Sequence, residues 1–128
     1  MTEILVLAKR IGNLFHEITD ISMQLADALD RRDEVSMEMI IAMRAEPIDR
    51  LAIADRSLRE ILGELDDGDE AARIRAILNG DAAQAIDQQE KLLSEQASAN
   101  IRAHRRLMEL DEILSRKIAR ERSVYNND

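Results

Sequence analysis

The sequence predicts an all-α fold: an elongated antiparallel helical bundle or coiled coil with long N- and C-terminal helices, forming a single helical domain over residues 1–128. Its hydrophobic residues are mainly Ala (17), Leu (15), Ile (15) and Met (6), with three Val and two aromatic residues, a composition that favours helices over strands. One Pro and four Gly are too few for the many tight turns of a β-sandwich or barrel. Apolar residues also recur at helical spacing from the start of the chain.

The first helix is expected over residues 4–29. Its apolar residues alternate at spacings of three and four, as at the a and d positions of a heptad repeat: Ile4, Leu7, Ile11, Leu14, Ile18, Ile21, Leu25 and Ala28. Phe15, Leu5 and Ala8 widen this stripe to the broader face of a bundle helix. At 1.5 Å per residue the helix is about 40 Å long.

A second helical region is expected over residues 33–65, kinked or broken near Pro47. The charged residues 30–33 precede it, and they fit either a short turn or a solvated stretch of continuing helix. Pro47 lacks an amide donor, so it should start a helix or kink one. The methionine-dense segment 37–43 suits core filling or an adaptable binding surface.

A short helix over residues 70–78 and a last helix over residues 82–123 complete the expected order. The acidic, Gly-containing segment 66–69 predicts a loop before the short helix. Gly80 can adopt the left-handed conformation that closes a helix, and Asp81 can cap the next one.

Three amides occupy the apolar stripe of the last helix: Gln89, Gln96 and Asn100. A buried amide without partners costs about 1–3 kcal/mol. These residues therefore either form a polar layer that fixes the register of the helices or leave part of a groove open for a partner.

The charge distribution argues against nucleic-acid binding. The net charge is −8, and residues 1–101 carry 21 acids and 11 bases, so most of the surface should repel phosphate backbones. Residues 102–122 carry 7 bases and 4 acids. This basic stretch suits the negative end of a helix dipole or an acidic partner.

No catalytic or metal-binding constellation stands out, so we expect no enzyme activity, no cofactor and no metal. The two histidines, His16 and His104, lack a Glu-x-x-His motif, and metal sites need three or four ligands. The acidic turn that begins at Asp66 fails the EF-hand pattern, because Ile77 occupies the twelfth position, where the final Glu is required. Cysteine is absent, which excludes disulfides and thiolate ligands.

Membrane insertion and secretion are not expected either. No apolar run approaches the roughly 18 residues of a membrane span. The acidic start Met1-Thr2-Glu3 lacks the basic and apolar regions of a secretion signal. A cytoplasmic location follows as an expectation.

Three features together resemble the FlgN-type flagellar export chaperones: the long N-terminal heptad helix, the segment from Leu29 to Leu62 with its charged turn, and the spaced leucines from Asn100 to Leu114. The resemblance implies a cytosolic chaperone that binds the amphipathic C-terminal helices of flagellar hook–filament junction proteins. Such a chaperone prevents premature assembly of these proteins and delivers them to the export apparatus.

The resemblance also places the cargo site on the last helix. It implies that cargo contacts Leu93, Leu107, Leu110, Leu114 and Ile118. Tyr125 becomes the candidate contact for the export machinery. The competing hypothesis is a self-associating coiled-coil adaptor with no export role, in which a homo-oligomer buries the same apolar face.

Overall fold

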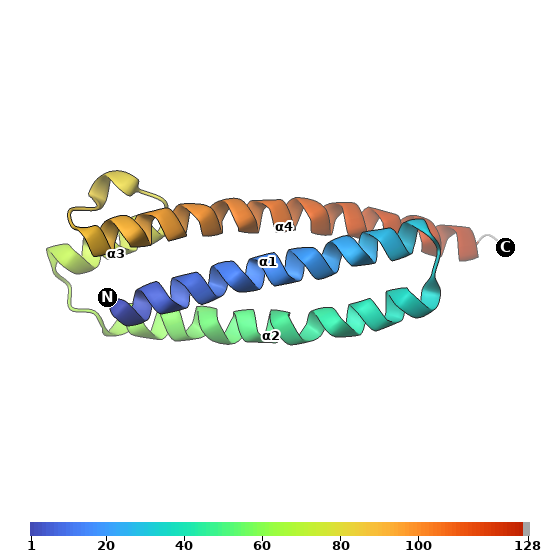
Figure 1. Cartoon of the computed structure of the whole chain (residues 1–128), viewed down its shortest axis with the longest axis horizontal. Coiled ribbons are helices and arrows are strands. Elements are labelled where there is room, and N and C mark those ends of the chain that lie inside the picture. The colour runs from blue at the N-terminus through green and yellow to red at the C-terminus, as the bar shows by residue number, and fades with distance from the viewer. Residues whose placement is uncertain (127–128) are drawn as a thin grey trace.

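The computed structural model describes residues 1–126, and side chains through residue 122. In this part of the chain the fold is all-α, as the sequence predicts. The elements are α1 (Thr2–Asp30), α2 (Glu34–Glu64), α3 (Asp69–Leu78), the 3-10 helix η1 (Ala82–Gln84) and α4 (Gln88–Asn126). The three long helices lie side by side in an elongated bundle, with α3 and η1 at one end (Figure 1).

Helix α1 lies between α2 and α4 and packs against both (Figure 1). Consecutive long helices alternate in direction, so α4 runs beside α1 in the same direction as α1. Two contacts show this parallel alignment. Asn100 donates a hydrogen bond to the backbone of Ala8 near the start of both helices, and Lys117 pairs with Asp30 further along both. The heptad stripe of α1 is buried from Ile4 to Ala28, which confirms that this stripe forms the centre of the core.

The charged residues between α1 and α2 form a turn and not a stretch of continuing helix. Arg32 has φ 56°, the left-handed conformation that interrupts a helix. Asp33 then caps α2: Ser36 donates to its carboxylate from Oγ (2.6 Å) and from the backbone N–H (3.1 Å). These hydrogen bonds lower the pKa of Asp33, because they stabilise the ionised carboxylate.

Pro47 lies inside α2, and the helix is not broken there. The sequence predicts either a kink or a break at this proline, because proline removes one intrahelical hydrogen bond. The buried residues of α2 are Ile40, Pro47 and Ala54, seven positions apart and therefore on one face. Packing of this face against α1 keeps α2 continuous through the proline.

The last helix begins later than expected, at Gln88 instead of residue 82. Gly80 has φ 103° and closes α3 as predicted. Asp81, however, caps only η1, accepting from the Ala83 N–H at 3.2 Å. A second aspartate, Asp87, starts α4 by accepting the Glu90 N–H at 2.8 Å. Two successive caps therefore divide the predicted continuous helix.

Candidate functional site

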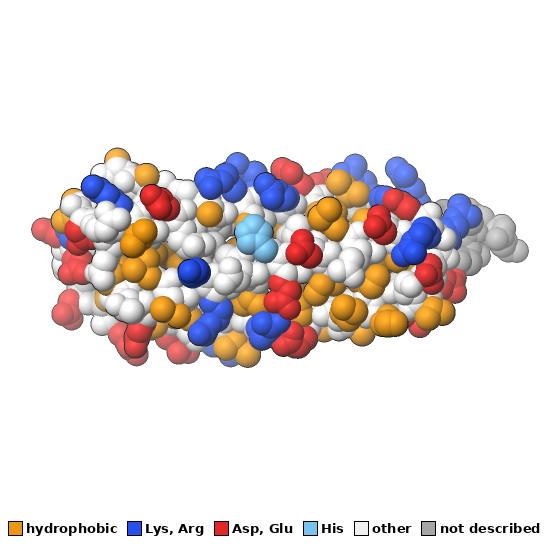
Figure 2. Space-filling view, in the orientation of Figure 1, with side chains coloured by type: hydrophobic (Ala, Val, Ile, Leu, Met, Phe, Trp, Pro, Cys, Tyr) orange, Lys and Arg blue, Asp and Glu red, His pale blue; other side chains and the backbone are white. Residues whose placement is uncertain are grey.

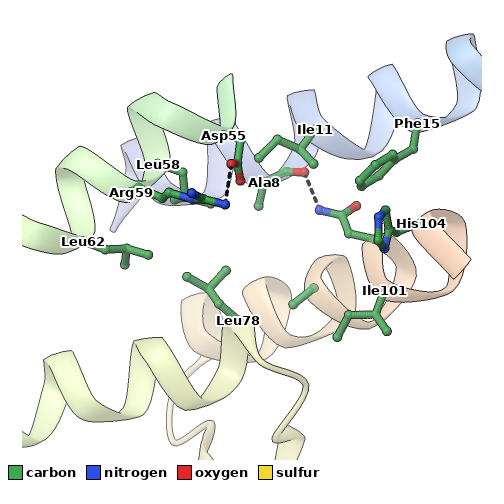
Figure 3. Close-up of a pocket in the computed structure, with 12 residues that line it drawn as sticks. Ala8, Ile11, Phe15, Asp55, Leu58, Arg59, Leu62, Leu78, Ile101 and His104 are labelled. Carbon is green, nitrogen blue, oxygen red and sulfur yellow. Dashed lines mark hydrogen bonds and ion pairs between the residues drawn. The ribbon is translucent and has the colours of Figure 1, made fainter. Parts of the chain in front are cut away.

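A groove lies between α2 and α4, with α1 as its floor (Figure 3). Its cavity has a volume of about 380 Å³. Side chains from all four α-helices line it: Ala8, Ile11 and Phe15 from α1, Asp55, Leu58, Arg59 and Leu62 from α2, Leu78 from α3, and Ala97, Asn100, Ile101 and His104 from α4. The groove thus lies where the bundle lacks a fourth helix.

Helix α3 fills the same space at the end of the bundle. Ile74 and Ile77 pack in one cluster with Ile4 and Leu93, and α2 contributes partly buried side chains to it. The guanidinium of Arg75 also donates to the carbonyl oxygen of Leu62 at 2.8 Å. α3 ends at Leu78, which lines the groove, so the cavity begins where this short helix stops.

The walls of the groove combine apolar and polar groups (Figure 3). Leu58, Leu62 and Ile101 are half-buried and face the cavity. The rings of Phe15 and His104 lie 5.4 Å apart at an interplanar angle of 48°. This combination is typical of sites that bind an apolar body and orient it with a few polar groups.

The charged groups of the groove lie on the α2 wall. Arg59 and Asp55 form an ion pair of 3.0 Å one helical turn apart (Figure 3). Because each side chain is substantially exposed, the pair contributes little to stability. Both charges therefore remain accessible to a bound group.

Two of the three amides form a polar layer between α4 and α1. Gln96 Nε2 donates to Asn100 Oδ1 at 2.8 Å, and Asn100 Nδ2 donates to the Ala8 carbonyl oxygen at 2.8 Å. Both amides pack over Gly12, where an added Cβ would lie 2.5 Å from Asn100 Oδ1. Gln89 instead is exposed. The layer therefore fixes the register of α1 and α4.

The expected cargo residues lie mainly inside the monomer. Leu93, Leu107 and Leu114 are only 0%, 6% and 3% exposed. Leu110 and Ile118 are half-buried and pack against the cluster that contains Leu114. These side chains hold the bundle together and offer little surface to a partner. Tyr125 lies outside the side chains that the structure describes.

A second apolar surface, the methionine stripe, is formed by Val35, Met39 and Met43, which are 76%, 58% and 47% exposed. They lie four residues apart and so on one side of α2. Hydrophobic side chains gather over this half of α2 in Figure 2. Met37 and Ile40 of the same segment pack into the core, so part of the methionine-dense segment fills the core and part of it is exposed.

A buried ion pair joins α3 to α4 near the groove. Glu90 is almost completely buried, and the Arg73 guanidinium contacts both of its carboxylate oxygens, at 2.9 and 3.4 Å. The hydrogen bonds to Glu90 raise the pKa of Arg73. The pair anchors the short helix whose end bounds the cavity.

Sequence reasoning did not identify the groove residues as a site, apart from Asn100, which it placed either in a polar layer or beside an open part of a groove. The predicted helix lengths could have indicated the groove, because a short helix beside three much longer ones leaves part of the bundle without a fourth helix. The described residues contain no group of three or more His, Cys, Asp or Glu placed to hold a metal ion. Among the same residues, no helix is long and apolar enough to cross a membrane.

Comparison of the chain with models of known protein families, with curated proteins and with solved structures found no match.

Proposed function

We propose that this protein is an export chaperone of the FlgN type, which binds the amphipathic C-terminal helix of a flagellar hook–filament junction protein in the groove between α2 and α4. It would keep that segment from assembling early and present it to the export apparatus in the cytoplasm. The sequence resemblance supplies the class of cargo. The observation that carries the binding role is the groove itself.

The groove suits a helical segment because α3 already fills the neighbouring space. Side chains from α1, α2 and α4 surround Ile74 and Ile77 of α3, so the bundle accommodates a helix in this position. A partner helix beyond Leu78 would complete a fourth position along the bundle. It would bury its own apolar stripe against Leu58 and Ile101.

A cargo segment that is disordered before binding is compatible with this groove. A disordered segment that folds as it docks loses conformational entropy, and burial of apolar surface at about 25 cal/mol per Å² offsets this loss. No covalent chemistry is required. Such binding produces a negative heat-capacity change, which gives the proposal a calorimetric signature.

The test is isothermal titration calorimetry with synthetic C-terminal peptides of hook–filament junction proteins at several temperatures. We expect binding with a negative heat-capacity change. Ile101→Asp places a charge at the cavity and should abolish binding. Leu92→Asp is the matched control, because Leu92 is exposed on the same helix and does not line the groove.

Circular dichroism melts establish whether both variants fold. If Ile101→Asp does not fold, His104→Asp replaces it, since His104 is exposed at the groove. Peptides that fail to bind the folded parent protein, or that bind a folded groove variant as tightly as the parent, would refute the proposal.

The methionine stripe favours a second candidate function, that of a self-associating adaptor. Its exposed side chains lie outside the groove lining and could be covered by a second copy. Light scattering on the purified protein tests this function directly. A stable dimer that Met39→Ser and Met43→Ser together convert to monomer supports the adaptor, and a monomeric parent protein excludes it.

A further inference from the structure

We infer that two copies of this protein pair through the outer side of α2, with the two α2 helices antiparallel. The contact uses the isoleucine–alanine face, which consists of Ile41, Ala45, Ile48 and Ala52. This face lies outside the groove lining, so the inference goes beyond the proposed function and does not depend on it. Two observations carry it: the order of large and small side chains along the face, and the charges at its ends.

The isoleucine–alanine face is apolar and lies on the surface of the bundle. Ile41 and Ile48 are 49% and 40% exposed, and both alanines are exposed as well. The two isoleucines directly follow the buried residues Ile40 and Pro47, and consecutive residues of a helix lie about 100° apart around its axis. The face therefore lies to one side of the surface that packs against α1, and the monomer leaves it uncovered.

The order of side chains makes this face complementary to itself. Its members are separated by four, three and four residues, the spacing of a short coiled-coil seam. In an antiparallel pair with a twofold axis between residues 46 and 47, Ile41 lies opposite Ala52 of the second copy, and Ala45 lies opposite Ile48. Every layer then joins one isoleucine to one alanine. A parallel pair would instead place like side chains opposite each other.

The charges at the ends of the face favour the same antiparallel alignment. In this alignment Glu38 of one copy lies beside Arg56 of the other, and the twofold axis produces the contact twice. Both side chains are exposed, and no ion pair between residues that the structure describes involves either of them. Glu38 also approaches Asp55 of the other copy, but Arg59 pairs with that carboxylate within its own chain at 3.0 Å.

The small size of the contact predicts a weak dimer. The isoleucine–alanine face spans about three helical turns, whereas a standard interface of roughly 800 Å² per partner uses about 20–30 residues on each side. We therefore expect a reversible equilibrium between monomer and dimer, with a dissociation constant on the order of 10 μM. Such a dimer forms and separates with protein concentration.

Sedimentation equilibrium of the full-length protein from about 1 μM to about 0.5 mM tests the dimer. Ile48→Glu should weaken it at least about tenfold, because it places a carboxylate in an apolar layer. If circular dichroism shows that this variant does not fold, Ala45→Glu replaces it. The matched control combines Met39→Ser with Met43→Ser on the methionine stripe and should leave the dimer unchanged.

The same measurement distinguishes this contact from self-association through the methionine stripe. A parent protein that stays monomeric at about 0.5 mM overturns the inference. A dimer that the folded glutamate variant retains overturns it too, as does a dimer that the two serine substitutions abolish. None of these outcomes affects the binding of junction-protein peptides in the groove, which calorimetry measures separately.

A charge exchange tests the alignment of the two helices. Glu38→Arg alone and Arg56→Glu alone should each weaken the dimer at least about threefold, because each places like charges together twice. The double variant exchanges the two charges and should recover the affinity of the parent protein. A double variant that is weaker than both single variants contradicts the antiparallel alignment.

Cysteine cross-linking provides a second test of the alignment. The chain contains no cysteine, so an introduced thiol reports only the intended contact. A mixture of Ile41→Cys and Ala52→Cys should form a covalent dimer on oxidation with copper phenanthroline. Neither variant should cross-link alone, because equivalent positions are then about 16 Å apart along the helices. Cross-linking of either variant with itself, or none in the mixture, overturns the inference.

Discussion

Asn100 of α4 donates a 2.8 Å hydrogen bond from Nδ2 to the backbone carbonyl oxygen of Ala8 in α1. This contact brings a side-chain amide against the helix backbone, and Gly12 on the next turn provides the necessary space. The polar layer therefore depends on the absence of a side chain at one position of α1.

The first prediction concerns that position. Gly12→Ala should lower the free energy of unfolding by about 1–3 kcal/mol, because the added Cβ would lie 2.5 Å from Asn100 Oδ1 and 2.6 Å from Gln96 Nε2. Moving these amide groups away would break the hydrogen bonds from Gln96 to Asn100 and from Asn100 to Ala8. Glycine to alanine within a helix ordinarily stabilises it by up to about 1 kcal/mol. Urea unfolding followed by circular dichroism measures the difference.

Gly63→Ala is the matched control, because nothing lies within 4 Å of a Cβ added there. It should leave stability unchanged or raise it by up to about 1 kcal/mol. A Gly12→Ala variant as stable as Gly63→Ala would show that the polar layer yields readily to an added methyl group.

The second prediction concerns the core role of the last helix. Leu107→Ala should cost about 2–5 kcal/mol of stability, because Leu107 is buried in the bundle. Leu92→Ala, on the exposed side of the same helix, should change stability by less than about 0.5 kcal/mol. Urea unfolding of the two variants decides the matter, and equal midpoints would mean that α4 does not pack as described.

The third prediction concerns the ion pair between α3 and α4. Arg73→Met removes the partner of the buried Glu90 carboxylate and leaves a charge without compensation. It should lower the melting temperature, and adding Glu90→Gln should restore part of the loss. Differential scanning calorimetry of the single and double variants tests this order. A double variant less stable than Arg73→Met would contradict it.

The fourth prediction concerns acid pH. The folded protein lowers the pKa of Asp33 through its hydrogen bonds with Ser36, so the unfolded chain binds a proton to this group more readily. The cap's contribution is therefore present above the ordinary Asp pKa of about 3.9 and is lost as pH falls through the lower folded value.

Asp33→Ala should accordingly reduce stability at about pH 7 and much less at about pH 2. Urea unfolding at both pH values checks the difference, with Asp49→Ala on the exposed surface of α2 as the control. A loss of equal size at both pH values would assign the effect of Asp33 to something other than its charge.

The sequence predicts the parts of this fold that depend on local pattern. The heptad stripe of α1, the loop before α3 and the left-handed Gly80 follow from spacing and turn chemistry. The continuity of α2 through Pro47 does not, because it depends on packing against α1. The predicted start of α4 is six residues too early, because Asp81 caps only the 3-10 helix η1 and Asp87 caps the long helix.

The candidate site was less accessible to sequence reasoning. The leucines of α4 form the same regular stripe whether another helix of the chain or a partner protein covers them. The sequence pattern therefore does not show which of the two they contact. In the structure Leu93 and Leu114 pack in clusters with side chains of α1, and Leu107 is buried as well. The groove arises from the length of α3 relative to its neighbours, a property of the assembled bundle.

The central position of α1 has a consequence for synthesis. Because α2 follows α1 directly and α4 is made after both, α1 and α2 can pair as a hairpin while the rest of the chain is still on the ribosome. Until α4 is complete, the side of α1 that carries Ala8 and Gly12 stays open to solvent. During that interval the nascent hairpin itself presents an uncovered helix-binding face.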